Sequence, residues 1–239
     1  MKNKNPNLQT VLITGGGTGI GRAFARALLQ NEFGTVVIAS RRKEVLEQTA
    51  NELSTEFPNQ RVLSFPFDLR SREQTEELVR FTSEQCGAID VLINNSGLAL
   101  PQTVEVITAE AWETVLDTNL RGAMWLTQLL LPKMVEQDFG DIVNVSSQAG
   151  KHGYADVPAY CASKYGLLGF ADALRDDVCK RNLNIRVFNF CPALVEVERD
   201  ETSEPRQGFL HVRSMTQTLL YALMLDRGVI LHDIGISAR

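Results

Sequence analysis

A tyrosine and a lysine stand four residues apart in the stretch Tyr160-Cys-Ala-Ser-Lys164. In a helix the two side chains project from one face, about 40° apart around the axis. A free tyrosine has a pKa near ~10, too high for proton exchange at neutral pH, and a neighbouring ammonium lowers that pKa by favouring the phenolate. The pair is therefore a candidate acid/base, although this spacing is also common on solvated helix faces.

A second candidate is the run TGGGTGIG at residues 14–21, which follows an apolar stretch. Glycine at this density is typical of backbone that lies against a phosphate. No register fits G-x-G-x-x-G, and the spacing that does fit is Gly15-x-x-x-Gly19-x-Gly21. At a strand-to-helix junction these glycines would provide, in turn, a tight turn, a close backbone approach and tight helix packing for a pyrophosphate. The alternative is a tight turn that binds nothing.

Both candidates must be positioned by the surrounding elements, which alternate along the chain. Strands are predicted at residues 11–14, 35–39, 61–65, 90–94, 141–146, 185–190 and 229–234, and helices at 19–31, 43–57, 71–86, 108–137, 158–181 and 212–225. Several strands are apolar at nearly every position, as expected when helices cover both faces of a parallel sheet. The sequence therefore predicts an α/β fold, a doubly wound Rossmann domain with a seven-stranded parallel sheet and helices on both faces.

Composition and patterning indicate a single domain without a nucleic-acid or membrane partner. No linker or repeat interrupts the alternation, so residues 1–239 are expected to form a single domain with one long irregular loop at about 193–211. The net charge is −5 with no basic block, which argues against a nucleic-acid or membrane-surface partner. No run reaches ~18 apolar residues, and the polar N-terminus leads directly into the first strand. We therefore expect no membrane span, no signal peptide and a cytoplasmic location.

The metal-binding residue types show no ligand pattern. The cysteines at 86, 161, 179 and 191 lack C-x-x-C spacing and are expected to be reduced and buried. His152, His211 and His232 are far apart in the sequence. We therefore expect no metal site.

Four further motifs follow the glycine run in order: NNSG at 94–97, Asn119 within a long helix, NVSSQAG at 144–150 and YCASK at 160–164. Together with T-G-x-x-x-G-x-G they make the chain, from about residue 10 to residue 192, resemble the short-chain dehydrogenase/reductase family. The resemblance implies an NAD(P)-binding Rossmann domain with a catalytic tetrad of Asn119, Ser147, Tyr160 and Lys164.

The resemblance also implies a role for each member of the tetrad. A dihydronicotinamide would deliver hydride to a carbonyl carbon while Tyr160 donates a proton to the oxygen that Ser147 polarises. Lys164 would tune Tyr160 and hydrogen-bond the nicotinamide ribose, and Asn119 would hold a water that connects Lys164 to solvent. Without the family, Asn119 would be a surface residue or a local kink, because asparagine is a poor helix former. Ser146 is expected to pack or cap.

The cofactor preference is predicted from the end of the second strand. NAD-binding enzymes place an acidic residue there, whereas this chain has Ser40, Arg41 and Arg42. Arginine matches a 2′-phosphate, so we expect NADP(H), with NAD(H) as the alternative. Ser40 and Arg41 are the first candidates, since Arg42 fits the start of the next helix. Asp68 resembles the family's adenine-binding aspartate, and its alternative role is a helix cap.

The resemblance completes the expected cofactor site. Asn94 and Asn95 would fix neighbouring backbone, and Gly97 would let the chain pass close to the adenosine ribose. The residues expected to bind the cofactor are Gly15, Gly17, Thr18, Gly19, Ile20, Gly21, Ser40, Arg41, Asp68, Leu69, Asn95, Ser96, Gly97, Tyr160, Lys164, Pro192 and Val195.

The chain departs from the family after the sixth strand. Ala193 and Val197 stand where the family has a glycine and a threonine that bonds the nicotinamide carboxamide. The missing hydroxyl would cost about 0.5–1.5 kcal/mol of nicotinamide positioning without removing activity. The C-terminal VILHDIGISAR resembles the carbonyl-reductase-like branch, which acts on varied small carbonyl and hydroxy compounds.

We therefore expect an NADP(H)-dependent oxidoreductase that interconverts a small carbonyl compound and its alcohol. The alternatives are a 3-oxoacyl carrier-protein reductase and a non-catalytic NADP(H)-binding sensor or scaffold. The carrier-protein reading would require a basic patch near the entrance, which the acidic loop does not supply. The resemblance also implies a homo-oligomer, a tetramer or dimer, with the helices at 108–137 and 158–181 pairing between subunits.

Overall fold

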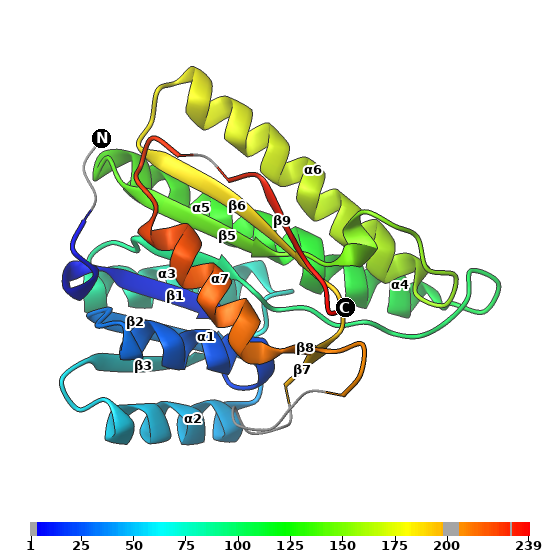
Figure 1. Cartoon of the computed structure of the whole chain (residues 1–239), viewed down its shortest axis with the longest axis horizontal. Helices are drawn as coiled ribbons and strands as arrows, with labels where there is room; N and C mark the ends of the chain where they lie inside the picture. Colours follow the sequence, from blue (N-terminus) through cyan, green and yellow to red (C-terminus); the bar gives the residue numbers. More distant parts are fainter. Residues whose placement is uncertain (1–3, 198–205, 230) are drawn as a thin grey trace.

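A seven-stranded parallel sheet forms the centre of the molecule (Figure 1). The computed structural model describes residues 4–197, 206–229 and 231–239. The strands, in their order across the sheet, are β3 (Arg61–Pro66), β2 (Thr35–Ser40), β1 (Thr10–Thr14), β4 (Val91–Asn94), β5 (Gly140–Val145), β6 (Ile185–Pro192) and β9 (Asp233–Ile236). Every neighbouring pair is parallel, so the predicted doubly wound α/β fold is confirmed.

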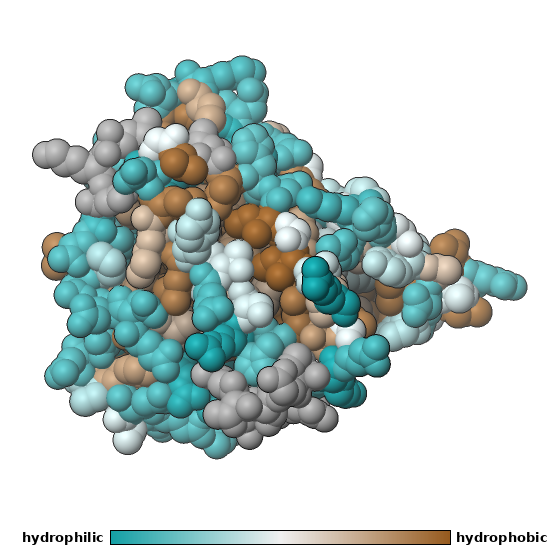
Figure 2. Space-filling model, viewed as in Figure 1, coloured by the Kyte–Doolittle hydropathy of each residue, from teal (hydrophilic) through white to brown (hydrophobic). Residues whose placement is uncertain are grey.

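Helices cover both faces of this sheet, as the apolar strands predicted. One face packs against α1 (Gly19–Gln30), α2 (Lys43–Glu56) and α7 (Val212–Met224). The other face packs against α3 (Arg72–Cys86), α5 (Gly122–Glu136) and α6 (Pro158–Lys180). Side chains alternate between the two cores along each strand, with Ile13 in the first and Leu12 in the second. On the face seen in Figure 2, hydrophilic residues form most of the rim and hydrophobic ones gather toward the middle.

The strand order places an opening at one edge of the sheet. β1 lies between β2 and β4, so the segments that leave β1 and β4 diverge to opposite faces. In open α/β sheets this divergence creates a crevice at the carboxyl ends of the strands. The glycine run and the NNSG motif follow β1 and β4 directly, so both border this crevice.

The predicted helix at 108–137 is interrupted. It consists of α4 (Ala109–Leu116), a π-helical turn (Asp117–Arg121) and α5. A π turn inserts one extra residue into the helix and re-aims a side chain, and such turns are frequent at functional sites. Here the turn contains Asn119, which helical periodicity alone placed on a continuous helix.

The seventh strand begins later than predicted. Residues 226–229 form a turn, closed by a 2.8 Å hydrogen bond from the Val229 N–H to the Asp226 carbonyl. Arg227 in this turn is buried and binds the Asp141 carboxylate, so the segment cannot extend as a strand. β9 starts only where it pairs with the end of β6, and its bounds are 233–236 rather than 229–234.

The predicted irregular loop contains regular structure at its ends. β7 (Val195–Glu196) pairs with β8 (Leu210–His211) in a small parallel sheet, so the expectation of a wholly irregular segment was wrong. The Arg206 guanidinium holds the Glu196 carboxylate with two contacts of 2.8 and 2.9 Å, which closes the base of this excursion. Residues 198–205 of the predicted loop lie outside the described residues.

A row of amides crosses the sheet beneath its carboxyl edge. The Asn94 amide donates to Asn144, the Asn144 amide to Asn189, and the Asn189 amide to Asp233, at 3.0, 3.2 and 2.8 Å. The three asparagines are almost fully buried and pair in register on β4, β5 and β6. Because buried amides need hydrogen-bond partners, the row specifies the register of these three strands.

The described cysteines are all free. Cys161 and Cys191 are buried as predicted and Cys86 is half-buried, whereas Cys179 is exposed near the end of α6. In the part of the chain that the structure covers, no group of three or more His, Cys, Asp and Glu residues is placed to hold a metal ion. Within the same residues, no helix combines the length and the apolar character needed to cross a membrane.

Candidate active site

A cleft of about 1010 Å³ opens at the carboxyl ends of the central strands. All the residues predicted to be catalytic or cofactor-binding line it, except Gly21 and Asn119. Those two lie directly behind its wall. Gly21 packs against the turn and bend at residues 15–18, called the glycine turn below, and Asn119 contacts the segment that follows β4. The structure therefore brings the predicted residues together at one site.

The three glycines of the T-G-x-x-x-G-x-G run occupy different environments. Gly15 has a φ of +68°, which a residue with a side chain rarely adopts. A Cβ atom at Gly21 would lie 2.3 Å from the Gly15 carbonyl oxygen, so α1 could not approach β1 this closely. At Gly19 the nearest atom to an added Cβ would be on Val197, 3.9 Å away, and this glycine faces open cleft. The tight turn and the close helix packing are thus where the sequence predicted them, and Gly19 has the open space that a close approach of a ligand to the backbone requires.

The start of α1 is suited to an anion. Thr18 stands at the N-cap, yet its side chain makes no capping hydrogen bond, and no acidic residue lies in the first turn. The first amides of the helix are therefore not capped by a side chain and point toward the cleft, where the helix dipole favours negative charge. This arrangement fits a pyrophosphate.

Thr14 and Asn95 connect the glycine turn to β4. The Thr14 hydroxyl accepts the backbone N–H groups of Asn95 and Ser96 at 3.1 and 3.0 Å. The Asn95 amide donates back to the Thr14 carbonyl at 2.9 Å. Asn95 thus fixes neighbouring backbone as expected, whereas Asn94 does not, because its amide binds the side chains of Thr127 and Asn144 within the sheet.

Asn119 is 1% exposed, so the reading of this residue as a surface position is wrong. Its amide donates to the Leu98 carbonyl at 2.9 Å and to the Ser163 hydroxyl at 3.0 Å, and its carbonyl accepts the Leu98 N–H at 2.9 Å. Asn119 therefore clamps the segment after β4 to α6. The π turn aims the side chain inward to make these contacts.

Lys164 is buried beneath the cleft, with 3% of its surface exposed. Its ammonium donates to the Val145 carbonyl at 2.7 Å. The Ser146 hydroxyl donates to the Lys164 carbonyl at 3.2 Å, so Ser146 joins β5 to α6, in agreement with a packing role. A Cβ at Gly97 would lie 3.3 Å from Nζ, so the glycine of NNSG makes room for the ammonium.

The titration of Tyr160 differs from the expectation. Burial raises the pKa of this phenol, and a hydrogen bond with Ser147 opposes that increase. Burial also lowers the pKa of Lys164 to about 8, so this lysine is already neutral at the pH where the phenol titrates and does not favour the phenolate there. Its ammonium, bound to the Val145 carbonyl, lies 5.5 Å from the centre of the tyrosine ring. Without a bound ligand, therefore, Tyr160 stays protonated at neutral pH.

The opposite end of the cleft is basic. Ser40, Arg41 and Arg42 line it, and the Arg42 guanidinium donates to the Thr18 hydroxyl at 3.2 Å. The sequence favoured Ser40 and Arg41 as cofactor ligands because Arg42 directly precedes α2. It did not predict the contact of Arg42 with the glycine turn. Only the packing of β2 beside β1 brings these two residues together.

Asp68 lines the same end of the cleft but is not a helix cap. Ser71 caps α3 by accepting the Gln74 N–H at 3.2 Å. The Asp68 carboxylate instead pairs with the Arg70 guanidinium, with contacts of 2.6 and 3.0 Å, and this pairing holds the pKa of Asp68 below its usual value. The sequence did not predict this role of Arg70, because no motif indicates an ion pair between residues two apart in a loop.

The two departures from the family both lie at the cleft. Ala193 donates its N–H to the Ile236 carbonyl at 2.8 Å, which ties the end of β6 to β9. Val197 is 39% exposed and presents an apolar side chain opposite Gly19. Tyr154 and Asp156 also line the cleft, although no sequence motif marked them.

The short chain dehydrogenase family model matches residues 9–208, which is most of the chain. The chain belongs to the short-chain dehydrogenase family. A ketoacyl reductase of Nostoc sp., HetN, is 40% identical over 187 residues, which cover 78% of this chain and 63% of that protein. The chain therefore spans less than two thirds of the length of that relative. An uncharacterised oxidoreductase of Staphylococcus aureus is 28% identical over 95% of this chain and 96% of its own length.

Solved structures of two dehydrogenases share the fold over nearly the whole chain. The serine dehydrogenase of Escherichia coli superposes with a TM-score of 0.84 at 28% identity, over 96% of this chain and 98% of that one. An alcohol dehydrogenase of Thermococcus sibiricus, complexed with 5-hydroxy-NADP, gives a TM-score of 0.86 at 22% identity, over 96% of each chain. The second likeness concerns the fold alone.

The burial of Lys164 predicts a pH dependence of stability. A lysine with a pKa of about 8 in the folded protein and ~10.4 in the unfolded chain takes up a proton on unfolding between these values, so its contribution to stability rises with pH in that window. From pH 7.5 to 9.5 the stability of the wild type should gain about 2 kcal/mol relative to Lys164→Met. Urea unfolding of both proteins at each pH measures this difference in the free energy of unfolding. The Cys191 thiol, whose pKa is raised to about 11 by burial, has the opposite effect on stability, and this effect cancels because both proteins contain it. If the free energy of unfolding depends on pH in the same way in both proteins, Lys164 is not desolvated.

Proposed function

We propose that this chain is an NADP(H)-dependent oxidoreductase that interconverts a small carbonyl compound and its alcohol, with Tyr160 as the acid/base. The observation that carries the proposal is the position of Tyr160, Ser147 and Lys164 along one wall of a cleft whose other end contains the glycine turn and two arginines. Structures of relatives support it, since a form of serine dehydrogenase 27% identical to this chain is complexed with NADP⁺.

The side chains divide the work of the reaction. Bound NADPH would supply the hydride that reduces the carbonyl carbon. The raised pKa of Tyr160 keeps the phenol protonated, so it can donate its proton to the carbonyl oxygen. Ser147 would donate a hydrogen bond to the same oxygen and orient it. Lys164, with a pKa of about 8, can lose and regain a proton near neutral pH and restore the proton on Tyr160.

The basic end of the cleft supports NADP(H) over NAD(H). Arg41 is exposed and lines the cleft next to Ser40, where a guanidinium can pair with a 2′-phosphate. Arg42 adds a second guanidinium that already contacts the glycine turn. No carboxylate stands at the end of β2 to accept a ribose hydroxyl.

A 3-oxoacyl carrier-protein reductase is the second candidate, favoured by the 40% identity with the ketoacyl reductase HetN. An acidic carrier needs basic residues around the entrance. The described residues that line the catalytic half of the cleft do not provide an exposed basic group. Lys164 is buried there, and Asp156 is acidic. We therefore place small carbonyl compounds first, and a carrier-bound 3-oxoacyl thioester in the same assay compares the two.

Removal of the Tyr160 hydroxyl tests the chemistry. In Tyr160→Phe, kcat for ketone reduction should fall by about 10²–10⁴, because the carbonyl oxygen loses its proton donor. Binding of NADPH, followed by its fluorescence, should persist. Tyr221→Phe is the control, since Tyr221 on α7 is 64% exposed and does not line the cleft. If the wild type reduces no ketone, aldehyde or thioester, the oxidoreductase proposal fails and a non-catalytic NADP(H)-binding protein replaces it.

Removal of one guanidinium tests the cofactor preference. Arg41→Ala should reduce the ratio of kcat/KM for NADPH over NADH by about ten- to a hundredfold, because one charge-assisted contact of roughly 1.5–3 kcal/mol is lost. Lys43→Ala removes a nearby positive charge that does not line the cleft, and it should leave the ratio unchanged. An Arg41→Ala variant with the wild-type ratio would contradict the assignment.

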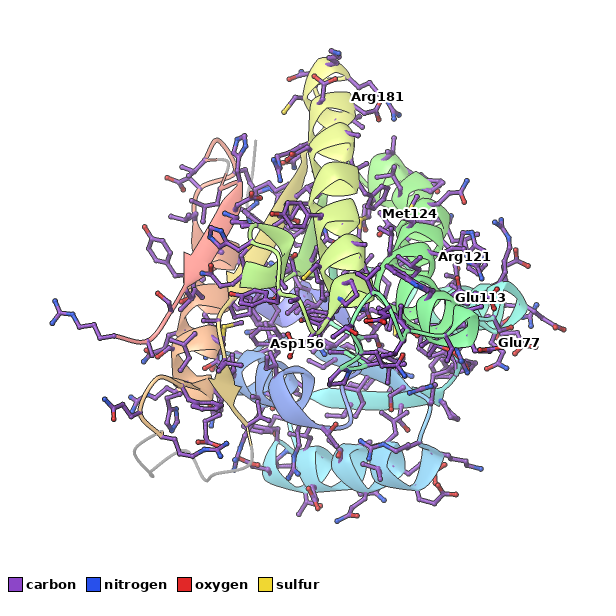
Figure 3. All side chains as sticks on the ribbon, turned by 90° about the vertical axis from the view of Figure 1, so that its right-hand side faces the viewer. Glu77, Glu113, Arg121, Met124, Asp156 and Arg181 are labelled. Atoms are coloured by element: carbon purple, nitrogen blue, oxygen red, sulfur yellow. The ribbon has the colours of Figure 1, made fainter. Side chains whose placement is uncertain are left out.

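We also propose a homo-oligomer in which the α4–α5 region and α6 pair between subunits. Met124 on α5 and Tyr165 on α6 expose large apolar side chains on these helices, and Met124 projects from the α5 side in Figure 3. Light scattering should give the mass of a dimer or tetramer. Introduction of a charge with Met124→Glu should shift the mass toward the monomer, and a monomeric wild type would contradict the proposal.

A further inference from the structure

Two side chains in the catalytic half of the cleft have no part in the hydride-transfer chemistry. Tyr154 and Asp156 stand in the segment that leads into α6, and both line the cleft. Tyr154 is 49% exposed and Asp156 is exposed. An aromatic ring and a carboxylate are the groups that proteins use to hold an ammonium ion.

The backbone of this segment is anchored while the two side chains remain available. The Gln102 N–H donates to the Asp156 carbonyl at 2.8 Å, and the Tyr154 N–H contacts the Cys161 sulfur at 3.3 Å. Figure 3 shows Asp156 between the N-terminal end of α6 and α1. Within the described residues, the Asp156 carboxylate makes no ion pair and no side-chain hydrogen bond. Its charge is therefore presented to whatever occupies the cleft.

The lysines nearest Asp156 in the sequence, and Arg206 before β8, do not form an ion pair with it. Lys151 does not line the cleft, and its ammonium lies 3.5 Å from Asp233. Arg206 pairs with Glu196, and the Lys164 ammonium is bound to the Val145 carbonyl. The cleft thus has the guanidinium groups of Arg41 and Arg42 in its lining at the cofactor end and the exposed Asp156 carboxylate in its catalytic half.

We infer that the carbonyl compound or alcohol handled by this site carries a positively charged amine, held by the Asp156 carboxylate and the Tyr154 ring. The inference rests on the proposed function and names its substrate class. A carboxylate or phosphate on the substrate would instead face Asp156 with like charge.

Three ketones of one frame test the charge preference with NADPH: 4-(aminomethyl)acetophenone as the cation, 4-methylacetophenone as the neutral compound and 4-acetylbenzoate as the anion. The wild type should show a kcat/KM for the cation about tenfold or more above that for the anion. Asp156→Asn should reduce this ratio to within about threefold. Tyr154→Leu should lower the preference for the cation over the neutral ketone by a few-fold, and Tyr154→Phe should retain it, because the ring remains.

Glu105→Gln is the matched control. It changes the net charge by the same amount as Asp156→Asn, and Glu105 is exposed in the segment after β4 but does not line the cleft. The three kcat/KM values should stay at their wild-type ratios in this variant. If Glu105→Gln changes the ratios as much as Asp156→Asn does, general electrostatics explains the preference and the inference fails.

The neutral ketone separates this inference from the proposed function. If the neutral ketone is reduced, and the cation and anion are turned over equally or Asp156→Asn leaves their ratio unchanged, only the inference is overturned. If no ketone is reduced, the proposed function fails for this class. Calorimetric titration with 4-methylbenzylamine and 4-methylbenzoate then decides the charge preference without turnover. Tighter binding of the amine that is lost in Asp156→Asn supports the inference, and equal binding of both ions overturns it.

Discussion

The site is built around the ammonium group of one buried lysine. Lys164 is almost fully buried, which lowers its pKa to about 8, so its charge must be balanced by groups that the fold supplies. The Val145 carbonyl at the end of β5 provides a direct partner, and Gly97 leaves the space that a side chain would fill. Ser146 ties the same strand to the backbone of α6. This network fixes the helix that presents Tyr160, one turn before Lys164, to the cleft.

The alignment of the strand ends has its own polar support. The amide row from Asn94 through Asn144 and Asn189 to Asp233 pairs buried groups that would otherwise lack partners. A slip of one residue between two strands would break these hydrogen bonds and turn the side chains to the other face. The row therefore fixes the register of β4, β5 and β6, and residues at and beyond the carboxyl ends of these strands line the cleft.

Much of the site could be predicted because its motifs are local in sequence. The spacing of Gly15, Gly19 and Gly21 already contained the turn, the open approach and the close helix packing. The β-branched runs and helical periods predicted the parallel sheet and its covering helices. The π turn around Asn119 could not be predicted, since its cause is a set of contacts with Leu98 and Ser163, both far away along the chain.

By itself, the sequence determined the order of the strands and helices and the position of the glycine turn, because these depend on residue type and short spacing. The candidate catalytic side chains came from the resemblance to the family. Only the tertiary structure decided how the groups titrate and which of them touch. Burial raises the pKa of Tyr160, whereas the adjacent lysine had predicted a lower value. Lys164 is buried as well, so it loses its proton before the phenol titrates. Likewise, Arg42 meets Thr18, and Asp156 lines the cleft, only because packing brings distant segments together.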